Sequence, residues 1–188
     1  QLFRVPASVS LARARGLPRS VWGTAFAHAG VGIMVLGIVG ETAYKEERIL
    51  QVRPGETVTI RDFGLTLEGL IPRQGPNYRD LVARFRVTEG GRDAGVLEPA
   101  KRIFTARNFP TTEAALLTRG ASQLYVSPGD VAADGSIAVR LFYKPFVLLI
   151  WIGTLVMVFG GLLSLSDRRL RIGAPKPAAK RPQLQAAE

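Results

Sequence analysis

The 188-residue sequence contains no cysteine and one histidine, His28. Without cysteine the chain forms no disulfide and no thiolate metal site, and it lacks the CxxC and CxxCH motifs of redox proteins and c-type cytochromes. With no histidine between residues 41 and 144, this segment holds neither a histidine metal cluster nor a His-containing catalytic triad. These absences exclude several classes of enzyme and redox protein.

Two long segments lack formal charge. Ser20–Gly40 has 21 residues and Pro145–Ser166 has 22, and the second lies between Lys144 and Asp167. About 20 apolar residues are enough for a helix to cross the ~30 Å hydrocarbon core of a bilayer. We therefore predict two transmembrane helices. The first segment is too long for the apolar part of a secretory signal, and no obvious cleavage site follows it.

The net charge of +10 is concentrated beside these two segments. Residues 1–19 carry four arginines and no acid, and residues 167–188 carry six basic and two acidic groups. Residues 41–144 carry 15 basic and 13 acidic groups. Basic residues gather on the cytoplasmic side of membrane helices, so we expect both termini in the cytoplasm and residues 41–144 across the membrane. The basic flanks favour contact with membrane lipid and not with nucleic acid, because no aromatic residues are interleaved with them.

The segment between the two spans alternates apolar and polar residues, as half-buried strands do. Short strands separated by Gly- and Pro-containing turns predict a small antiparallel β-rich domain, either a sandwich or a barrel. Residues 111–120 fit either a helical turn or a strand, and residues 41–48 are expected to continue the first helix. Turns are expected at 61–63, 73–77 and 89–93. We expect strands over 56–60, 64–70, 81–88, 94–97, 101–106, 124–126 and 136–143.

His28 lies within the first apolar segment. Ionisable groups are costly inside a membrane, so a histidine there is a functional hypothesis by default. On a helix its neighbours three and four residues away are Thr24, Ala25, Val31 and Gly32, most of them small. An imidazole beside such a surface suits an axial haem ligand. The alternative is that the small residues mark helix–helix packing and His28 hydrogen-bonds to a neighbouring helix.

The acidic residues of the β-rich segment are scattered and form no catalytic pattern. Arg84 and Arg86 alternate with apolar residues in LVARFRVT at 81–88. We interpret them as the solvated face of a strand. Contact with an acidic partner or with haem propionates is the alternative, because arginine suits carboxylate recognition.

Four motifs occur in a fixed order. They are WGTAFAHAGVGIMVLGIVGE at 22–41, KRIFTARNFPTTEAALLTRGASQLYVSPGD at 101–130, VRLFYKPFVLLIWIG at 139–153 and GGLLSLSDRRLR at 160–171. Together they resemble the C-terminal portion of the CcmF family, the membrane subunits of bacterial cytochrome c maturation. The resemblance covers about residues 19–172. Residues 121–127 depart from the family's usual pattern, so no function is carried over to them.

The resemblance implies a subunit of a haem lyase, which joins haem vinyl groups to the two thiols of a CxxCH motif in apocytochrome c. Its implied partners are a haem chaperone, other maturation subunits and apocytochrome c. It also implies a b-type haem held by two membrane histidines, which keeps the substrate haem reduced with quinol as a possible donor. His28 matches the second of these histidines and is the expected axial ligand to the haem iron.

Other features of the family are absent from this sequence. The tryptophan-rich WWD segment, two periplasmic histidines and the first membrane histidine belong to a region N-terminal to this stretch. The second haem ligand must therefore come from the remaining N-terminal CcmF region or from another chain. We expect a C-terminal fragment or one chain of a split protein, which is not catalytic alone.

The combined expectation is a multi-pass protein of the bacterial inner membrane. The competing hypothesis is a non-catalytic, membrane-anchored scaffold that binds partner proteins. A transporter is not favoured, since two spans form no conduit without partners. The predicted parts are a cytoplasmic basic segment at 1–19, a transmembrane helix with His28 at 20–43, a periplasmic β-rich domain at 44–144, a transmembrane helix at 145–166, and a cytoplasmic basic tail at 167–188, disordered from 173 onward.

Overall fold

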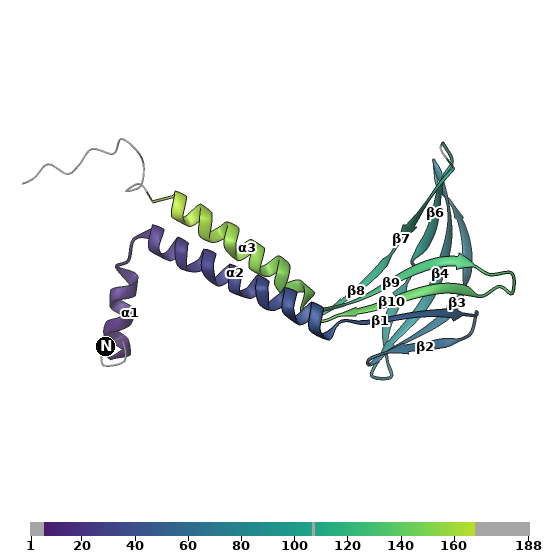
Figure 1. Cartoon of the computed structure of the whole chain (residues 1–188), viewed down its shortest axis with the longest axis horizontal. Coiled ribbons are helices and arrows are strands. Elements are labelled where there is room, and N and C mark those ends of the chain that lie inside the picture. The colour runs from purple at the N-terminus through teal and green to yellow at the C-terminus, as the bar shows by residue number, and fades with distance from the viewer. Residues whose placement is uncertain (1–5, 107, 168–188) are drawn as a thin grey trace, which may run out of the picture. The chain divides into compact units, whose positions relative to one another are not determined.

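The computed structural model describes residues 6–106 and 108–167 (Figure 1). The chain divides into two compact units, one formed by the residues up to Val31 with those from Thr154 onward, the other by Gly32–Gly153. The described elements are α1 (Ala7–Arg15), α2 (Arg19–Tyr44), β1 (Glu46–Val52), β2 (Thr57–Ile60), β3 (Phe63–Gln74), β4 (Tyr78–Glu89), β5 (Arg92–Leu97), β6 (Ala100–Phe104), β7 (Phe109–Glu113), β8 (Ala115–Arg119), β9 (Ser122–Val131), β10 (Ile137–Lys144) and α3 (Val147–Leu165).

Helices α2 and α3 are long and apolar enough to cross a membrane. Pro18 precedes α2, and its carbonyl accepts the first backbone hydrogen bonds of the helix from Val21 and Trp22. Proline is favoured at a helix start because its fixed φ suits the helix and its missing N–H would have no partner there. The short helix α1 lies in the basic segment, and Trp22 Nε1 donates a hydrogen bond to the carbonyl of Ala14 at 3.0 Å.

In the first unit, the two apolar helices meet backbone to backbone. A Cβ atom added at Gly23 would lie 2.5 Å from the backbone nitrogen of Ser164, and one added at Gly160 would lie 2.5 Å from that of Ala27. Real Cβ atoms essentially never come so close to backbone atoms, so both positions need glycine. Phe26 and Phe159 pack edge to face beside this contact, with ring centroids 5.4 Å apart.

In the second unit, the same two helices also meet through glycine. A Cβ atom at Gly37 would lie 2.8 Å from the backbone nitrogen of Ile150, and one at Gly40 would lie 2.7 Å from the ring of Phe146. Gly30, in the part of α2 that belongs to the first unit, is also buried. Positions 23, 30 and 37 are seven residues apart, a spacing that stays on one face of a helix with little drift.

The second unit also contains a sandwich of two antiparallel sheets. One sheet has the strand order β1-β10-β9-β8, and the other has the order β2-β3-β4-β6-β7, with β5 paired to β4 (Figure 1). Alternation along the strands turns the apolar side chains of both sheets toward one shared core. Its buried members are Val52, Ile60, Phe63, Leu65, Leu67, Ala83, Phe85, Val87, Leu97, Leu124, Val126, Ile137, Val139 and Leu141.

The structure confirms the predicted fold class, in which two apolar helices flank an antiparallel sandwich. It also confirms the turns predicted at 61–63 and 89–93, which connect β2 to β3 and β4 to β5 as hairpins. The second turn needs Gly90 and Gly91, because both have positive φ, at 55° and 80°. Two consecutive residues of this conformation form the two-residue turn that best fits the twist of a hairpin.

Two segments differ from the expectation or decide between alternatives. Residues 41–48 do not all continue the first helix, because α2 ends at Tyr44 and β1 begins at Glu46, where pairing with Tyr143 of β10 captures the chain. Residues 111–120 are extended and belong mainly to β7 and β8. The tail predicted to be disordered, 173–188, lies outside the described residues.

Candidate functional site

His28 is exposed on α2, and one of its ring nitrogens is held by the helix itself. Its Nδ1 atom lies 2.8 Å from the backbone carbonyl oxygen of Thr24, one turn earlier. A carbonyl oxygen only accepts hydrogen bonds, so Nδ1 carries the proton and donates it. In the neutral ring, Nε2 then keeps its lone pair. This is the arrangement found in metal-ligating histidines, whose second ring nitrogen is fixed by a hydrogen bond.

The small residues of α2 divide between two faces. Thr24, Val31 and Gly32 are exposed together with His28, and a Cβ added at Gly32 would meet nothing within 4 Å. The glycines that contact α3 lie on the other face, including Gly23. Packing against α3 therefore explains the buried glycines and does not involve His28. Within the described residues, the ring of His28 hydrogen-bonds to its own helix and not to a neighbouring one.

Within residues 6–106 and 108–167, His28 has one ring nitrogen that is not used by its hydrogen bond to Thr24, and there is no complete metal site. Among residues 6–106 and 108–167, there is no group of three or more His, Cys, Asp and Glu side chains that could hold a metal ion. The exposed Nε2 of His28 and the open space at Gly32 fit a flat group bound through a single protein ligand. A second histidine ligand has to come from outside this sequence, which contains no other histidine.

Asp167 caps a backbone N–H group at the start of α2, a role that was not predicted from the sequence. Its carboxylate Oδ2 accepts a hydrogen bond of 3.1 Å from the backbone N–H of Ser20, and the residue is only 6% exposed. The first N–H groups of a helix have no partner within the helix, and a carboxylate near them is favourable. Asp167 belongs to the DRR motif, and its place directly after an apolar span was the one signal for this contact.

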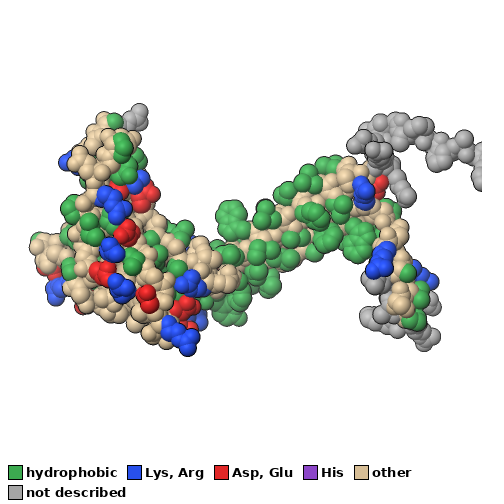
Figure 2. Space-filling model, turned by 180° about the vertical axis from the view of Figure 1, so that it is seen from behind, with side chains coloured by type: hydrophobic (Ala, Val, Ile, Leu, Met, Phe, Trp, Pro, Cys, Tyr) green, Lys and Arg blue, Asp and Glu red, His purple; other side chains and the backbone are tan. Residues whose placement is uncertain are grey.

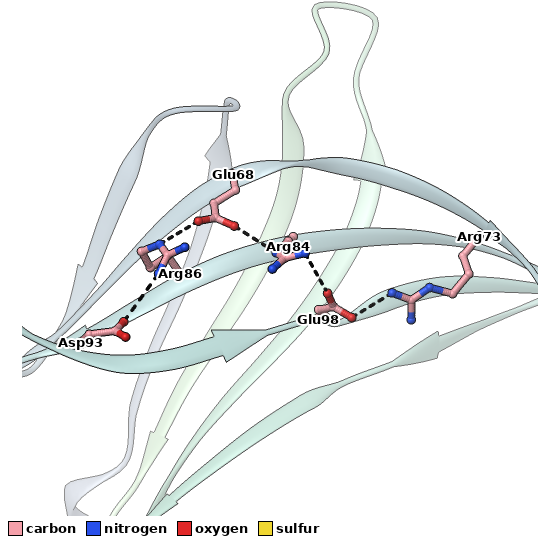
Figure 3. Close-up of polar contacts among 6 residues, drawn as sticks. All are labelled: Glu68, Arg73, Arg84, Arg86, Asp93 and Glu98. Atoms are coloured by element: carbon pink, nitrogen blue, oxygen red, sulfur yellow. Dashed lines mark hydrogen bonds and ion pairs between the residues drawn. The ribbon is translucent and has the colours of Figure 1, made fainter.

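The charged residues on the outer face of the six-stranded sheet pair with one another (Figure 3). Glu68 lies 3.0 Å from Arg84 Nε and 2.7 Å from Arg86 Nε, and Glu98 continues the series to Arg73 at 2.9 Å. Three arginines and three acids, the sixth being Asp93, thus form one connected ladder. The interpretation of Arg84 and Arg86 as a solvated strand face fits this pairing better than an anion site does, since their charges are already balanced.

A second ion pair on this sheet is mostly buried. The Nε and Nη2 atoms of Arg102 donate to the two carboxylate oxygens of Asp80, each at 2.9 Å. The Arg102 guanidinium also lies over the ring of Tyr78, 3.8 Å from its centroid. The hydrogen bond to Asp80 raises the pKa of Arg102 above its usual value. The Asp80 side chain is 4% exposed, so this pair resembles a structural core contact.

A polar cavity of about 540 Å³ lies beside the turn between β9 and β10. Its charged lining is internally paired, because Asp134 accepts hydrogen bonds from Ser136 Oγ at 2.6 Å and from Arg53 Nη2 at 2.8 Å. These hydrogen bonds hold the pKa of Asp134 well below its usual range, and the bond from Ser136 contributes most. The carboxylate is therefore ionised and fully engaged at neutral pH, which does not suit a general base or a nucleophile.

An antiparallel β-sandwich that continues at both ends into apolar helices, one with an exposed histidine, defines a class of helix-flanked sandwich proteins. Residues 43–145 match the family model described as CcmF C-terminal beta-sandwich. The chain therefore belongs to the CcmF family and corresponds to its C-terminal portion.

Individual relatives agree with this assignment. The chain is 55% identical over 187 residues to the cytochrome c-type biogenesis protein CycK of Bradyrhizobium diazoefficiens, covering 100% of this chain and 28% of that protein. It is 38% identical over 162 residues to CcmF of Pseudomonas aeruginosa, covering 86% and 25%. A solved structure named Cytochrome c Heme Lyase CcmF shares the fold with a TM-score of 0.67 at 17% identity, covering 88% of this chain and 26% of that one. The chain thus spans about a quarter of the length of these proteins.

Proposed function

We propose that this chain is the C-terminal part of a haem lyase subunit that acts in cytochrome c maturation. In this proposal, Nε2 of His28 supplies one axial ligand to a b-type haem in the membrane. The observation that carries the proposal is the hydrogen bond from Nδ1 to the Thr24 carbonyl, which leaves Nε2 as the free ligand nitrogen. The names of the similar proteins, cytochrome c-type biogenesis proteins and a haem lyase, support the type of reaction.

The proposal includes a membrane topology. Helices α2 and α3 cross the bacterial inner membrane, with residues 1–19 and 167–188 in the cytoplasm and residues 44–144 in the periplasm. The basic flanks support this orientation, because the net positive charge gathers beside the outer ends of the two apolar helices. The periplasmic sandwich then lies on the side where haem is attached to apocytochrome c.

In this proposal, residues of this chain bind the haem and orient it. The bound haem supplies one-electron transfer, and its potential depends on its axial ligands and surroundings. Donation from Nδ1 to the Thr24 carbonyl fixes the orientation of the His28 ring and leaves Nε2 as the nitrogen that can bind a metal. Gly32 leaves the helix surface one turn away unobstructed. The remaining N-terminal CcmF region, or another chain, supplies the second histidine, and the haem chaperone, other maturation subunits and apocytochrome c are the proposed partners.

Substitution of His28 tests the ligand role. In the full-length protein, His28→Ala removes the imidazole, and we expect low-spin b-type haem to fall by more than about tenfold, measured by pyridine haemochrome and reduced-state absorption. The matched control is Ile38→Ala, which truncates an exposed side chain of α2 about 80° around the helix axis from His28 and should leave haem unchanged. A fully assembled His28→Ala protein with an unchanged low-spin spectrum would overturn the proposal.

Gly32→Leu probes the same face without removing the ligand. The leucine side chain enters open space in this chain, so α2 and α3 should still pack normally. If the haem lies along this face, its content should fall while the protein stays folded. Unchanged haem would place the haem on another side of His28.

The second candidate function is a scaffold that binds partner proteins. The pairing of the charged residues on the sandwich favours it, because the ladder and the polar cavity offer no unengaged catalytic group among their members. Under this alternative, His28→Ala leaves haem and maturation activity intact, whereas replacing the sandwich abolishes association with the other maturation subunits in co-purification.

A further inference from the structure

An aromatic patch lies on the outer face of the four-stranded sheet. Phe142 of β10 is opposite Tyr125 of β9, and Tyr125 is opposite Leu116 of β8. These residues alternate with core residues such as Leu141 and Leu124, so they face away from the sandwich interior. The Tyr125 and Phe142 rings pack edge to face with centroids 5.6 Å apart, and Leu116 is 52% exposed.

Two lysines border this patch. Lys144 Nζ lies 5.1 Å from the centroid of Tyr125 and 5.4 Å from that of Phe142, and Lys45 Nζ lies 6.0 Å from Phe142. Within the described part of the chain, neither lysine forms an ion pair with a carboxylate. Glu47, on the same face, is instead 3.4 Å from Arg140. We call Lys45, Tyr125, Phe142 and Lys144 the lysine–aromatic platform, and its two ammonium charges remain uncompensated.

The chain connectivity fixes how far the platform lies from the apolar helices. Lys45 directly follows the last residue of α2, and Lys144 is three residues before the first residue of α3. Since a chain spans at most ~3.6 Å per residue, both lysine backbones lie within about 11 Å of a helix end. Tyr44 and Phe146, at the same junctions, are 61% and 43% exposed. Exposed aromatic residues and lysines are typical of the level of lipid head groups.

We propose that the lysine–aromatic platform binds the head-group phosphates of anionic phospholipids on the sandwich side of the membrane. The inference rests on the proposed membrane crossing of α2 and α3. The free ammonium groups complement the phosphate charge, and the rings beneath them suit the partly apolar boundary between head groups and acyl chains. The basic flanks at the outer helix ends form a separate contact on the other side.

A local fluorescence measurement tests the proposal. Because this sequence has no cysteine, Thr118→Cys introduces one labelling position in it, on an exposed residue opposite Gln123, which is itself opposite Lys144. The full-length protein, with any other reactive cysteine replaced, is labelled and placed in phosphatidylcholine nanodiscs. Trace phosphatidylglycerol or phosphatidylcholine with a doxyl quencher near the head group is then added. We define the quenching ratio as the quenching of the label by phosphatidylglycerol divided by its quenching by phosphatidylcholine, at the same mole fraction of quencher lipid. We expect a ratio of about five.

Charge-matched variants identify the groups responsible. Lys45→Gln with Lys144→Gln should reduce the quenching ratio to nearly one. The control, Arg73→Gln with Arg79→Gln, also removes two cations, both exposed, but from the other sheet. The control should keep the wild-type ratio.

The two control arginines lie far from the platform. Arg79 is the second residue of β4, and Arg73 of β3 is opposite Asp80, the next residue of β4. This end of β4 is about 10 residues, or ~33 Å, along the strand from Glu89. The Glu89 end is the one near the platform, because Glu89 forms an ion pair with Arg119, the last residue of β8.

The outcomes separate this inference from the proposed function. A wild-type ratio near one, or an unchanged ratio in the lysine variant, overturns the lipid site. Resistance of the protein to carbonate extraction reports the membrane crossing independently, and extraction would overturn both the crossing and the lipid site. Loss of the His28 haem proposal with the quenching ratio intact would leave the lipid site supported. Equal loss in both charge variants would indicate nonspecific attraction and would also overturn the site.

Discussion

Different kinds of contact stabilise the helix pair and the sandwich, each within itself. Helices α2 and α3 meet where side chains are missing, at Gly23, Gly37 and Gly160, and their outer surface is apolar (Figure 2). The sandwich instead buries large side chains, and the face seen in Figure 2 carries acidic and basic side chains interspersed with one another. We therefore expect one added methyl group at the helix contact to destabilise the helix pair. Loss of a whole charged group from the sandwich surface should change its stability little.

The largest expected effect comes from filling the helix contact. In Gly160→Leu, the new Cβ would collide with the backbone of Ala27, so the helices must separate. We expect destabilisation of about 3 kcal/mol or more, measured by thermal unfolding in detergent. The neighbouring Gly161→Leu is the matched control, because a Cβ there meets nothing within 4 Å. Equal stability of the two variants would remove the distinction between the helix faces.

An intermediate effect is expected at the buried ion pair of the sandwich. Asp80→Ala leaves Arg102 without its bidentate partner, and we expect the melting temperature of the sandwich, residues 43–145 produced alone, to fall by roughly 5 °C or more. Asp93→Ala is the control, since its side chain is 66% exposed and 3.9 Å from Arg86. Circular dichroism measures both. A drop no larger than that of the control would show that the sandwich does not depend on this pair.

The smallest effect is expected at the exposed ladder. Glu68→Gln removes the acid that joins Arg84 to Arg86, but the three side chains are 30% to 52% exposed. Exposed ion pairs contribute about 0–1 kcal/mol, and salt screens them. Urea unfolding of the same domain should therefore change by less than about 1 kcal/mol, and less still at 1 M salt. A larger loss of unfolding free energy that persists at high salt would show that the ladder stabilises the sandwich as the buried Asp80 pair is expected to do.

Local sequence patterns were sufficient for the parts of the fold that depend on neighbouring residues. Uncharged length predicted α2 and α3, alternation predicted the sandwich strands, and Gly90 with Gly91 predicted a hairpin turn. The start of β1 at Glu46 was not predictable this way, because the charged residues there favour a helix end and only pairing with β10 selects a strand.

The candidate site shows the same division. His28 was identifiable from its position in an uncharged segment, and the small residues around it indicated helix packing as an alternative. Which glycines contact α3 was not predicted. The position of Asp167 directly after an apolar span was a signal, but its partner Ser20 was not identifiable, since 147 residues separate the two. Likewise, the partners of Arg102 depend on strand register and not on any local motif.

The pairing of β1 with β10 has a consequence for the entropy of assembly. It holds Glu46 opposite Tyr143, at the residues that lead into α2 and out toward α3. Closing a flexible loop of about a hundred residues costs about 4 kcal/mol of chain entropy. This entropy is lost when the sandwich folds. Association of the two helices then loses only as much entropy as if a short linker joined them. The folded sandwich therefore acts as a clamp that raises the effective concentration of α2 for α3.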